Sequence, residues 1–333
     1  MHILFVAPGT QNGWHMPFVQ REAEALRAAG HEVEVFRFDN RSYWRFPGEL
    51  RRLRAAVRSR RPDLVHAQFG KFNALLAAFG GAPLVVTFRG TDINRNPKYS
   101  VLREALGIGA SQLAACFARG IVCVSREIRD KVWACRSRPS LVVPTGVDLK
   151  LFRPAERAVA RARLGHAPGE RVVLFNAGKN PAVKDPRLAE AAVVQARRLA
   201  GEIRFVVLDG KAPPEEIPVY MNAADVLLVT SFTEGSPTVV QEAMACDLPV
   251  VTVDVGDVRE RLEGVAACEV VASRDPAELG AALARVLLAG KRSDGRAHAA
   301  ALGIDSLAAR LADFYRSALS GRSRARRREL ESL

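Results

Sequence analysis

The sequence predicts an α/β protein with two Rossmann-like, doubly wound domains that face each other across a cleft. Three observations favour this class. Short apolar runs alternate with helical patterns, the alternation restarts near residue 150, and 333 residues suit two domains of about 150 residues better than one core. Ligands of such sheets bind at the carboxyl ends of the strands, so the loops that follow strands are the expected sites.

The first half of the chain predicts an N-terminal domain over residues 1–150. Its apolar runs predict strands at residues 2–7, 32–37, 64–67, 84–88, 120–124 and 140–143. The segment from Pro17 predicts a helix that ends at Gly30, because glycine often follows the last helical residue.

The second half predicts a C-terminal domain over residues 151–305, joined to the first near residues 144–154. Strands are expected at 171–177, 204–208, 226–230, 249–253 and 268–271, and helices at 186–199, 217–223, 237–245 and 276–288. A last helix at 306–320, patterned by Leu307, Leu311 and Phe314, could pack back across onto the first domain. The basic tail at 321–333 is expected to be disordered.

The net charge of +13 comes mostly from arginine and allows nucleic acid, an anionic membrane or a phosphorylated substrate as partners. Residues 49–63 predict a basic helix with Leu50, Leu53 and Val57 on one side, which could lie on anionic lipid or simply be solvated. Nucleic acid is not expected, because no aromatic residues interleave with the arginines. Five scattered cysteines without a CxxC pair indicate reduced thiols, and no apolar run is long enough to span a bilayer.

Polar residues follow two strands of the first domain. The loop with Gly9 and Gly13 lacks the GxGxxG pattern, so it gives little support to a dinucleotide site. In "PLVVTFRGTDINRNP", Arg89 and Asp92 lie at the carboxyl end of a buried strand, which favours ligand contact. Alternatively, Asp92 only caps the segment that follows it.

The second domain opens with "VVLFNAGKNPAVKDP", in which Gly178, Lys179 and Lys184 follow a buried strand. Two ammonium groups at one place favour an anion such as a diphosphate. The alternative is a pair of surface lysines on a loop.

The segment "SFTEGSPTVVQEAMACDLPVV" places two glutamates eight positions apart around a helix start. Ser236 is the expected N-cap and Pro237 the first helical residue, so free N–H groups there could bind phosphate. Glu242 lies beside an apolar surface and needs hydrogen-bond donors, which ribose hydroxyls would supply, whereas Glu234 could accept from a second sugar. Alternatively, Glu242 pairs with a polar group of the core.

With these residues, the chain resembles the retaining family-4 glycosyltransferases of GT-B fold over nearly its whole length. The resemblance rests on "VPTGVDLKLF", "GKNPAVK" and "EGSPTVVQEAMACDLPVV", the last being the E-x7-E motif and its following strand. Thr145 and Lys179 replace the family's Asn and Arg, Arg89 stands where many members have His, and Trp14 where a second glycine is common.

The resemblance implies the roles of the site residues. It implies donor binding by Gly178, Lys179, Lys184, Glu234, Gly235, Ser236, Pro237, Thr238, Val239 and Glu242. Within this set, the lysines bind the diphosphate, Glu234 contacts the sugar and Glu242 binds the ribose. Catalytic roles are expected for Glu234, Lys184, Lys179 and Arg89, and acceptor contacts for Gly13, Trp14, Arg89 and Asp92.

The predicted function is metal-independent transfer of a sugar, with retention, from a nucleotide-diphospho-sugar such as a UDP- or GDP-sugar to a glycan or lipid-linked acceptor. No D-x-D pair ends a strand, so no metal is expected, and no permanent cofactor is expected either. The predicted location is cytoplasmic, peripheral at the inner membrane face, as in polysaccharide biosynthesis. A glycoside hydrolase, a sugar phosphorylase, a nucleotide-sugar epimerase and a non-catalytic nucleotide-sugar-binding protein remain alternatives.

Overall fold

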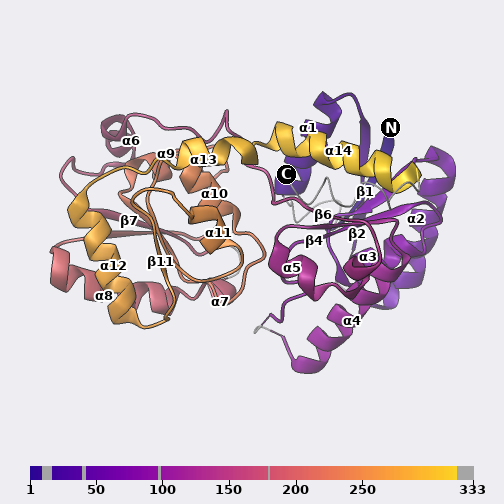
Figure 1. Cartoon of the computed structure of the whole chain (residues 1–333), viewed down its shortest axis with the longest axis horizontal. Coiled ribbons are helices and arrows are strands. Elements are labelled where there is room, and N and C mark those ends of the chain that lie inside the picture. The colour runs from indigo at the N-terminus through magenta and orange to yellow at the C-terminus, as the bar shows by residue number, and fades with distance from the viewer. Residues whose placement is uncertain (10–16, 40–42, 97–98, 179–180, 321–333) are drawn as a thin grey trace. The chain divides into compact units, whose positions relative to one another are not determined.

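The chain folds into two compact units, shown in Figure 1. The computed structural model describes residues 1–9, 17–39, 43–96, 99–178 and 181–320. The first unit comprises Met1–Gly146 together with the residues from Ile304 onward, and the second comprises Val147–Gly303. The predicted class, two α/β domains each with its own sheet, is confirmed. The tail predicted to be disordered lies outside the described residues.

The first unit contains a six-stranded parallel sheet with the strand order β2-β1-β3-β4-β5-β6. Its strands are β1 (His2–Pro8), β2 (Glu32–Phe38), β3 (Leu64–Ala67), β4 (Leu84–Phe88), β5 (Gly120–Cys123) and β6 (Ser140–Val142). All four residues of β3 and all five of β4 are buried, as expected for strands covered on both faces.

Helices cover both faces of this sheet. They are α1 (Pro17–Ala28), α2 (Phe46–Arg60), α3 (Lys71–Ala78), α4 (Val101–Phe117), α5 (Arg126–Lys131) and α14 (Ile304–Ser320), with short 3-10 turns η1 (Tyr43–Arg45) and η2 (Trp133–Arg136). Alternation along β1 divides the core, because Leu4 and Val6 join one buried cluster while Ile3 and Phe5 join another. Figure 1 shows α1 and α14 on one side of the sheet and α3, α4 and α5 on the other.

The C-terminal helix α14 therefore completes the first unit, as the sequence suggested. Its Phe314 lies so close to the sheet that a Cβ atom on Gly120 would be 2.8 Å from the ring. Gly146 is equally restricted, since a Cβ atom there would lie 2.7 Å from the Cα atom of Ile304. Both glycines permit backbone approaches that any larger residue would block.

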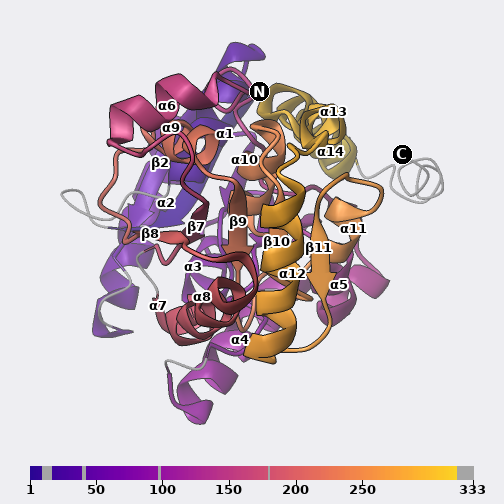
Figure 2. The same ribbon diagram turned by 90° about the vertical axis from the view of Figure 1, so that its left-hand side faces the viewer.

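The second unit contains a five-stranded parallel sheet with the order β11-β10-β9-β7-β8, whose strands lie side by side in Figure 2. Its strands are β7 (Val172–Asn176), β8 (Arg204–Leu208), β9 (Val226–Val229), β10 (Val250–Val253) and β11 (Glu269–Val271). One continuous buried cluster joins both faces of this sheet to its helices.

The helices of the second unit are α6 (Arg157–Leu164), α7 (Pro181–Lys184), α8 (Pro186–Ala200), α9 (Ile217–Ala223), α10 (Thr238–Ala245), α11 (Val258–Leu262), α12 (Pro276–Ala289) and α13 (Gly295–Ala299), followed by the turn η3 (Ala300–Leu302). Two of them begin with an aspartate cap followed by proline: Asp185 caps α8 and Asp275 caps α12. Across the described ranges of the chain, no helix is long and apolar enough to cross a membrane.

Candidate functional site

The predicted donor residues follow the strands of the second unit, at the edge of the sheet where the strands end. Loops leave β7, β9, β10 and β11 there, because all of these strands run parallel. Gly178, in the loop after β7, has a positive φ of 54° and its N–H donates to Asn176 Oδ1 over 3.0 Å. Lys179 lies outside the described residues.

The structure brings Lys184 and Glu234 together from two of these loops. Lys184 Nζ lies 2.6 Å from Glu234 Oε1, and both side chains are partly buried. Ser231 Oγ donates to the same carboxylate oxygen over 2.8 Å. The carboxylate is thereby held in one orientation, and an anionic ligand at this place would share the ammonium group with Glu234. The sequence assigned both residues to the site without predicting their ion pair.

Arg274 fixes the loops that carry this pair, and sequence reasoning missed it. Its guanidinium donates to Asp185 Oδ2 over 2.7 Å and to the carbonyl oxygens of Thr230 and Ser231, each over 2.9 Å. The same group lies 4.3 Å from the centre of the Phe232 ring. Its position in the sequence could have indicated this role, because Arg274 follows β11, the last strand of the second sheet, at the edge where Lys184 follows β7.

A second set of contacts ties the two loops directly. Thr230 Oγ1 donates to the carbonyl oxygens of Lys184 and Asp185 over 2.8 and 3.0 Å. The N–H of Phe232 donates to the carbonyl oxygen of Val183 over 2.9 Å. The segment that carries Lys184 is thus positioned by the segment that carries Glu234.

The predicted capping role of Ser236 is wrong. Helix α10 begins at Thr238 with Pro237 at the N-cap and, among the described residues, no side chain caps it. Ser236 Oγ instead donates to Asp257 Oδ2 over 2.8 Å, because that buried carboxylate needs donors. Burial raises the pKa of Asp257, although Arg261 and the Ser236 hydroxyl act in the opposite direction.

Because no described side chain caps α10, the start of this helix offers backbone amide groups. Gly235 and Ser236 are buried, whereas Thr238 is half-buried. The loop after β10 packs tightly here, since a Cβ atom on Gly256 would lie 3.0 Å from the Gly235 carbonyl oxygen. The amide groups at the start of a helix favour an anion.

Glu242 lies on α10, half-buried, one residue after the buried Gln241 and beside a buried apolar surface that includes Val239. Its charge reaches the nearby thiol of Cys246, whose pKa rises to about 12, mainly through burial and in part through this carboxylate. Glu234 thus precedes α10, and Glu242 lies within it.

Arg89 of the first unit is enclosed by protein groups. Its Nε donates to the Gln68 carbonyl oxygen over 3.0 Å, one terminal nitrogen to Thr145 Oγ1 over 3.0 Å, and the other to Glu22 Oε2 over 2.9 Å and to the Gln68 side chain. Its side chain is only 8% exposed, and the guanidinium lies 4.6 Å from the centre of the Phe18 ring. Every nitrogen of this side chain already donates a hydrogen bond, so its evident task is to hold three segments together.

Glu22 and His66 belong to the same buried network. Burial acts to raise the pKa of Glu22, but Arg89, His66 and Gln68 outweigh it and hold this pKa below its ordinary value. Burial lowers the pKa of His66 to about 4. Nδ1 of His66 receives Tyr315 OH over 2.6 Å and Gln68 Nε2 over 3.1 Å. A neutral ring that accepts at Nδ1 carries its proton on Nε2, which lies 2.6 Å from Thr87 Oγ1.

Asp92 performs the capping role that was the alternative to ligand contact. Its fully buried carboxylate accepts from the N–H groups of Gly70, Arg89 and Gly90 over 2.9, 3.0 and 2.8 Å. Burial raises its pKa, and these amides act against the rise. The other predicted acceptor residues, Gly13 and Trp14, lie outside the described residues.

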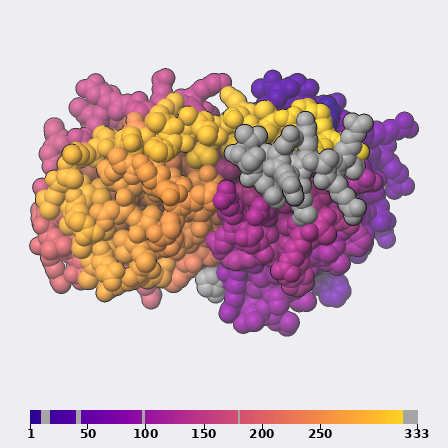
Figure 3. Space-filling view, viewed as in Figure 1, coloured from indigo at the N-terminus to yellow at the C-terminus, as the bar shows by residue number. Residues whose placement is uncertain are grey.

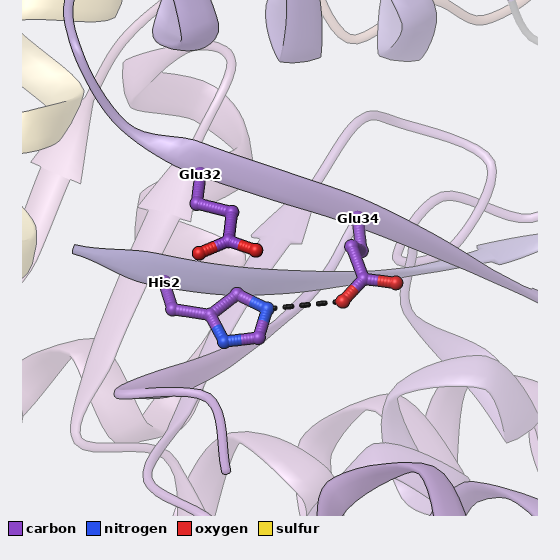
Figure 4. A group of neighbouring side chains, drawn as sticks. All are labelled: His2, Glu32 and Glu34. Carbon is purple, nitrogen blue, oxygen red and sulfur yellow. Dashed lines mark hydrogen bonds and ion pairs between the residues drawn. The ribbon is translucent and has the colours of Figure 1, made fainter. Parts of the chain in front are cut away.

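One cluster of metal-ligand types occurs within the described ranges, and it belongs to the first unit. His2, Glu32 and Glu34 place ligand atoms within 4.8 Å of one another at the start of β1 and β2 (Figure 4). Glu34 is already paired, with His2 Nε2 at 3.1 Å and with Arg60 at 3.0 Å. Around the Lys184–Glu234 pair, the ammonium group of Lys184 and the guanidinium of Arg274 supply positive charge, which suits an anion such as phosphate.

Models of two protein families match the chain. The model "Glycosyltransferase Family 4" matches residues 18–151, and "Glycosyl transferases group 1" matches residues 155–289. A D-inositol 3-phosphate glycosyltransferase of Thermobispora bispora is 30% identical, over 78% of this chain and 71% of the relative.

Solved structures show the same fold. A sucrose-phosphate synthase from Thermosynechococcus elongatus has a TM-score of 0.73 at 20% identity, covering 96% of this chain and all of that one. Anabaena Alr3699/HepE, solved in complex with UDP-glucose, has a TM-score of 0.71 at 19% identity, covering 95% and 100%.

Proposed function

Because this chain belongs to the family-4 glycosyltransferases of GT-B fold, we propose that it transfers a hexose from a nucleotide-diphospho-sugar to an acceptor hydroxyl with retention at the anomeric carbon. The observation that carries the proposal is the ion pair of Lys184 with Glu234 at the edge of the sheet, in a segment that leads into α10, which carries Glu242. Lys184 and the amide groups at the start of α10 can bind a diphosphate. The carboxylates of Glu234 and Glu242 can accept hydrogen bonds from sugar hydroxyl groups. Alr3699/HepE, which shares the fold, was solved with UDP-glucose, and this favours a UDP-sugar as the first donor to test.

The proposed donor-binding residues contact different parts of the donor. Lys184, together with Lys179, neutralises the diphosphate, and the amides at the start of α10 hold a phosphate. Glu242 accepts from the ribose hydroxyls, and Glu234 accepts from the donor sugar. Arg89 is a positioning residue, because its guanidinium is occupied by Glu22, Gln68 and Thr145.

The proposed step needs no protein nucleophile. The bond between the anomeric carbon and the diphosphate oxygen breaks, and the acceptor oxygen bonds to that carbon on the same face. The proton of the acceptor hydroxyl passes to the departing phosphate oxygen. Electrostatic stabilisation of the leaving diphosphate is then the main contribution of the protein, and neither a metal nor a permanent cofactor is required.

We further propose a glycan or lipid-linked saccharide as acceptor and a cytoplasmic location at an anionic membrane face. The arginines of α2 support this, since Arg51, Arg54 and Arg58 are exposed. The apolar side of the same helix does not insert into lipid, because Leu53 and Val57 are buried in the core. Contact through α2 is therefore electrostatic.

A panel of UDP-, GDP- and ADP-sugars tests the proposal. We expect slow hydrolysis of one donor, with retention read from the anomer first released, and transfer when a suitable acceptor is added. Glu242→Ala should abolish binding of the free nucleotide, whereas Glu234→Ala should bind it and turn over slowly. Glu278→Ala, an exposed carboxylate on α12, is the control. Full nucleotide affinity in Glu242→Ala would refute the ribose assignment, and an epimerised donor as the sole product would identify an epimerase.

A further inference from the structure

Helix α4 exposes its large apolar side chains to solvent. Leu102, Leu106, Leu113 and Phe117 are 70%, 60%, 48% and 53% exposed. They are spaced by four, seven and four residues, so they lie along one side of the helix. We call these four residues the α4 stripe. Exposed apolar residues are ordinary when scattered, but a contiguous row marks a surface with a partner.

The opposite side of α4 carries polar residues, and these are buried and bonded. Glu104 forms an ion pair with Lys71 at 2.9 Å. Ser111 Oγ donates to the carbonyl oxygen of Asp92 over 2.7 Å and accepts from the N–H of Lys71 over the same distance. These contacts fix the rotation of the helix, so the α4 stripe cannot turn inward to join the core.

Basic residues border the α4 stripe. The rings of Phe117 and Phe79 lie 5.9 Å apart, and Arg54 of α2 donates to the Phe79 carbonyl oxygen over 2.9 Å. Arg138 donates to the Cys116 carbonyl oxygen over 2.7 Å. Arg54 and Arg138 therefore lie at the Phe117 end of the α4 stripe. Figure 1 shows α4 with its first turns extending beyond the rest of the first unit, and Figure 3 shows this helix at the lower edge of the molecular surface drawn.

We propose that the α4 stripe inserts into the interface of an anionic lipid bilayer, with the bordering arginines on the headgroups. The only acidic residue within α4, Glu104, is buried, so no acid of this helix would oppose anionic lipid. Apolar side chains on one side of a helix with arginines beside them are the pattern of an interfacial helix. A second copy of the chain fits less well, because pairing two such faces would bring like charges together in a protein of net charge +13.

This inference deepens the membrane location proposed above by naming the surface that makes the contact. It does not depend on glycosyl transfer, because vesicle binding is measured without donor or acceptor. If sugar transfer fails and vesicle binding holds, only the enzymatic proposal is lost.

Flotation with lipid vesicles tests the α4 stripe. The full chain is mixed with phosphatidylcholine vesicles that contain phosphatidylglycerol, and with pure phosphatidylcholine vesicles as the uncharged comparison. The stripe variant carries Leu102→Ser, Leu106→Ser, Leu113→Ser and Phe117→Ser. The matched control places four serines at exposed apolar positions of the second unit: Val159→Ser, Val194→Ser, Leu199→Ser and Leu288→Ser.

We expect the wild type and the control to float with anionic vesicles, and the stripe variant to lose at least about tenfold in partitioning. Helix content by circular dichroism and donor hydrolysis without vesicles should be equal in all three proteins. Cys116 is exposed on the same helix and gives a direct readout, since an environment-sensitive fluorophore there should shift to the blue with anionic vesicles. A Cys116→Ser sample supplies the labelling background.

Three results would overturn the proposal. The first is equal flotation of the stripe variant and the wild type. The second is a wild type that binds neither kind of vesicle. The third is a wild-type dimer in solution that the stripe substitutions dissociate without any effect on lipid binding, which would identify a second copy as the partner.

Discussion

Mild acid should destabilise the first unit through His66. This imidazole is fully buried between Thr87, Gln68 and Tyr315, and burial lowers its pKa to about 4 from the ordinary 6.5. The folded state therefore leaves His66 unprotonated at pH 5, whereas the unfolded state protonates it. Stability rises with pH wherever the unfolded state binds more protons. The contribution is fully present above pH 6.5 and is lost as the pH falls towards 4.

The size of the effect follows from the two pKa values. A pKa difference of one unit corresponds to about 1.4 kcal/mol, so the full contribution of His66 is about 3 kcal/mol. Between pH 7 and pH 5 the expected loss in the free energy of unfolding is about 2 kcal/mol. His66→Gln is the informative variant, because the amide can accept from Tyr315 and donate to Thr87 but does not titrate.

The assay must follow the first unit alone, since a chain with two units need not unfold in one step. Hydrogen exchange in urea, measured on peptides from β3 and α14 at pH 7 and pH 5, meets this need. Wild type should lose about 2 kcal/mol more than His66→Gln over this interval, after correction for the pH dependence of intrinsic exchange. Parallel losses in both proteins would refute the assignment of a neutral, buried His66.

Three further substitutions probe the contacts of the two units. Arg274→Met should destabilise the second unit by about 2 kcal/mol and weaken donor binding, because Asp185 then lacks its positively charged partner. Urea unfolding measures the stability and nucleotide titration the binding. Arg285→Met, which removes an exposed ion pair, is the control. Asp92→Asn should cost about 2 kcal/mol in the first unit, since a single amide oxygen cannot satisfy three backbone N–H groups; an unchanged urea midpoint would contradict this. Ser236→Ala removes a donor to the carboxylate of Asp257 and should lower the free energy of unfolding by about 1 kcal/mol, as measured by thermal or urea unfolding. The decrease should be larger at pH 7 than at pH 4, because burial raises the pKa of Asp257 and the protonated acid needs that donor less.

The fold class and most strands could be predicted from the sequence, because alternating apolar runs and glycine or proline stops are local signals. The segment proposed to bind the donor was selected for the same reason: Glu234, Glu242 and the helix start between them lie within one short stretch. The Ser236 cap was a reasonable local inference that failed, since the competing partner Asp257 comes from a different loop.

What the sequence could not supply were contacts between distant positions. Arg89 was expected at a ligand, but its partners Glu22, Gln68 and Thr145 come from three separate segments, and only the folded sheet brings them together. Arg274 follows β11 at the site edge of the sheet, but its partners Asp185, Thr230 and Ser231 come from distant positions, so its role appears only in the folded structure. The orientation of α4 was also hidden, since burial of Glu104 and exposure of Leu106 reverse the usual pattern.

The place of α14 in the first unit has a consequence for how the chain acquires its structure during synthesis. The second unit is one continuous segment, Val147–Gly303, and all of it leaves the ribosome before α14 does. Until then the face of the first sheet around Ile3 and Phe5 lacks one of its covering helices, and Tyr315 is not yet available to His66. The unit whose residues begin the chain is thus the last to be completed, an exception to the usual N-terminal-first order.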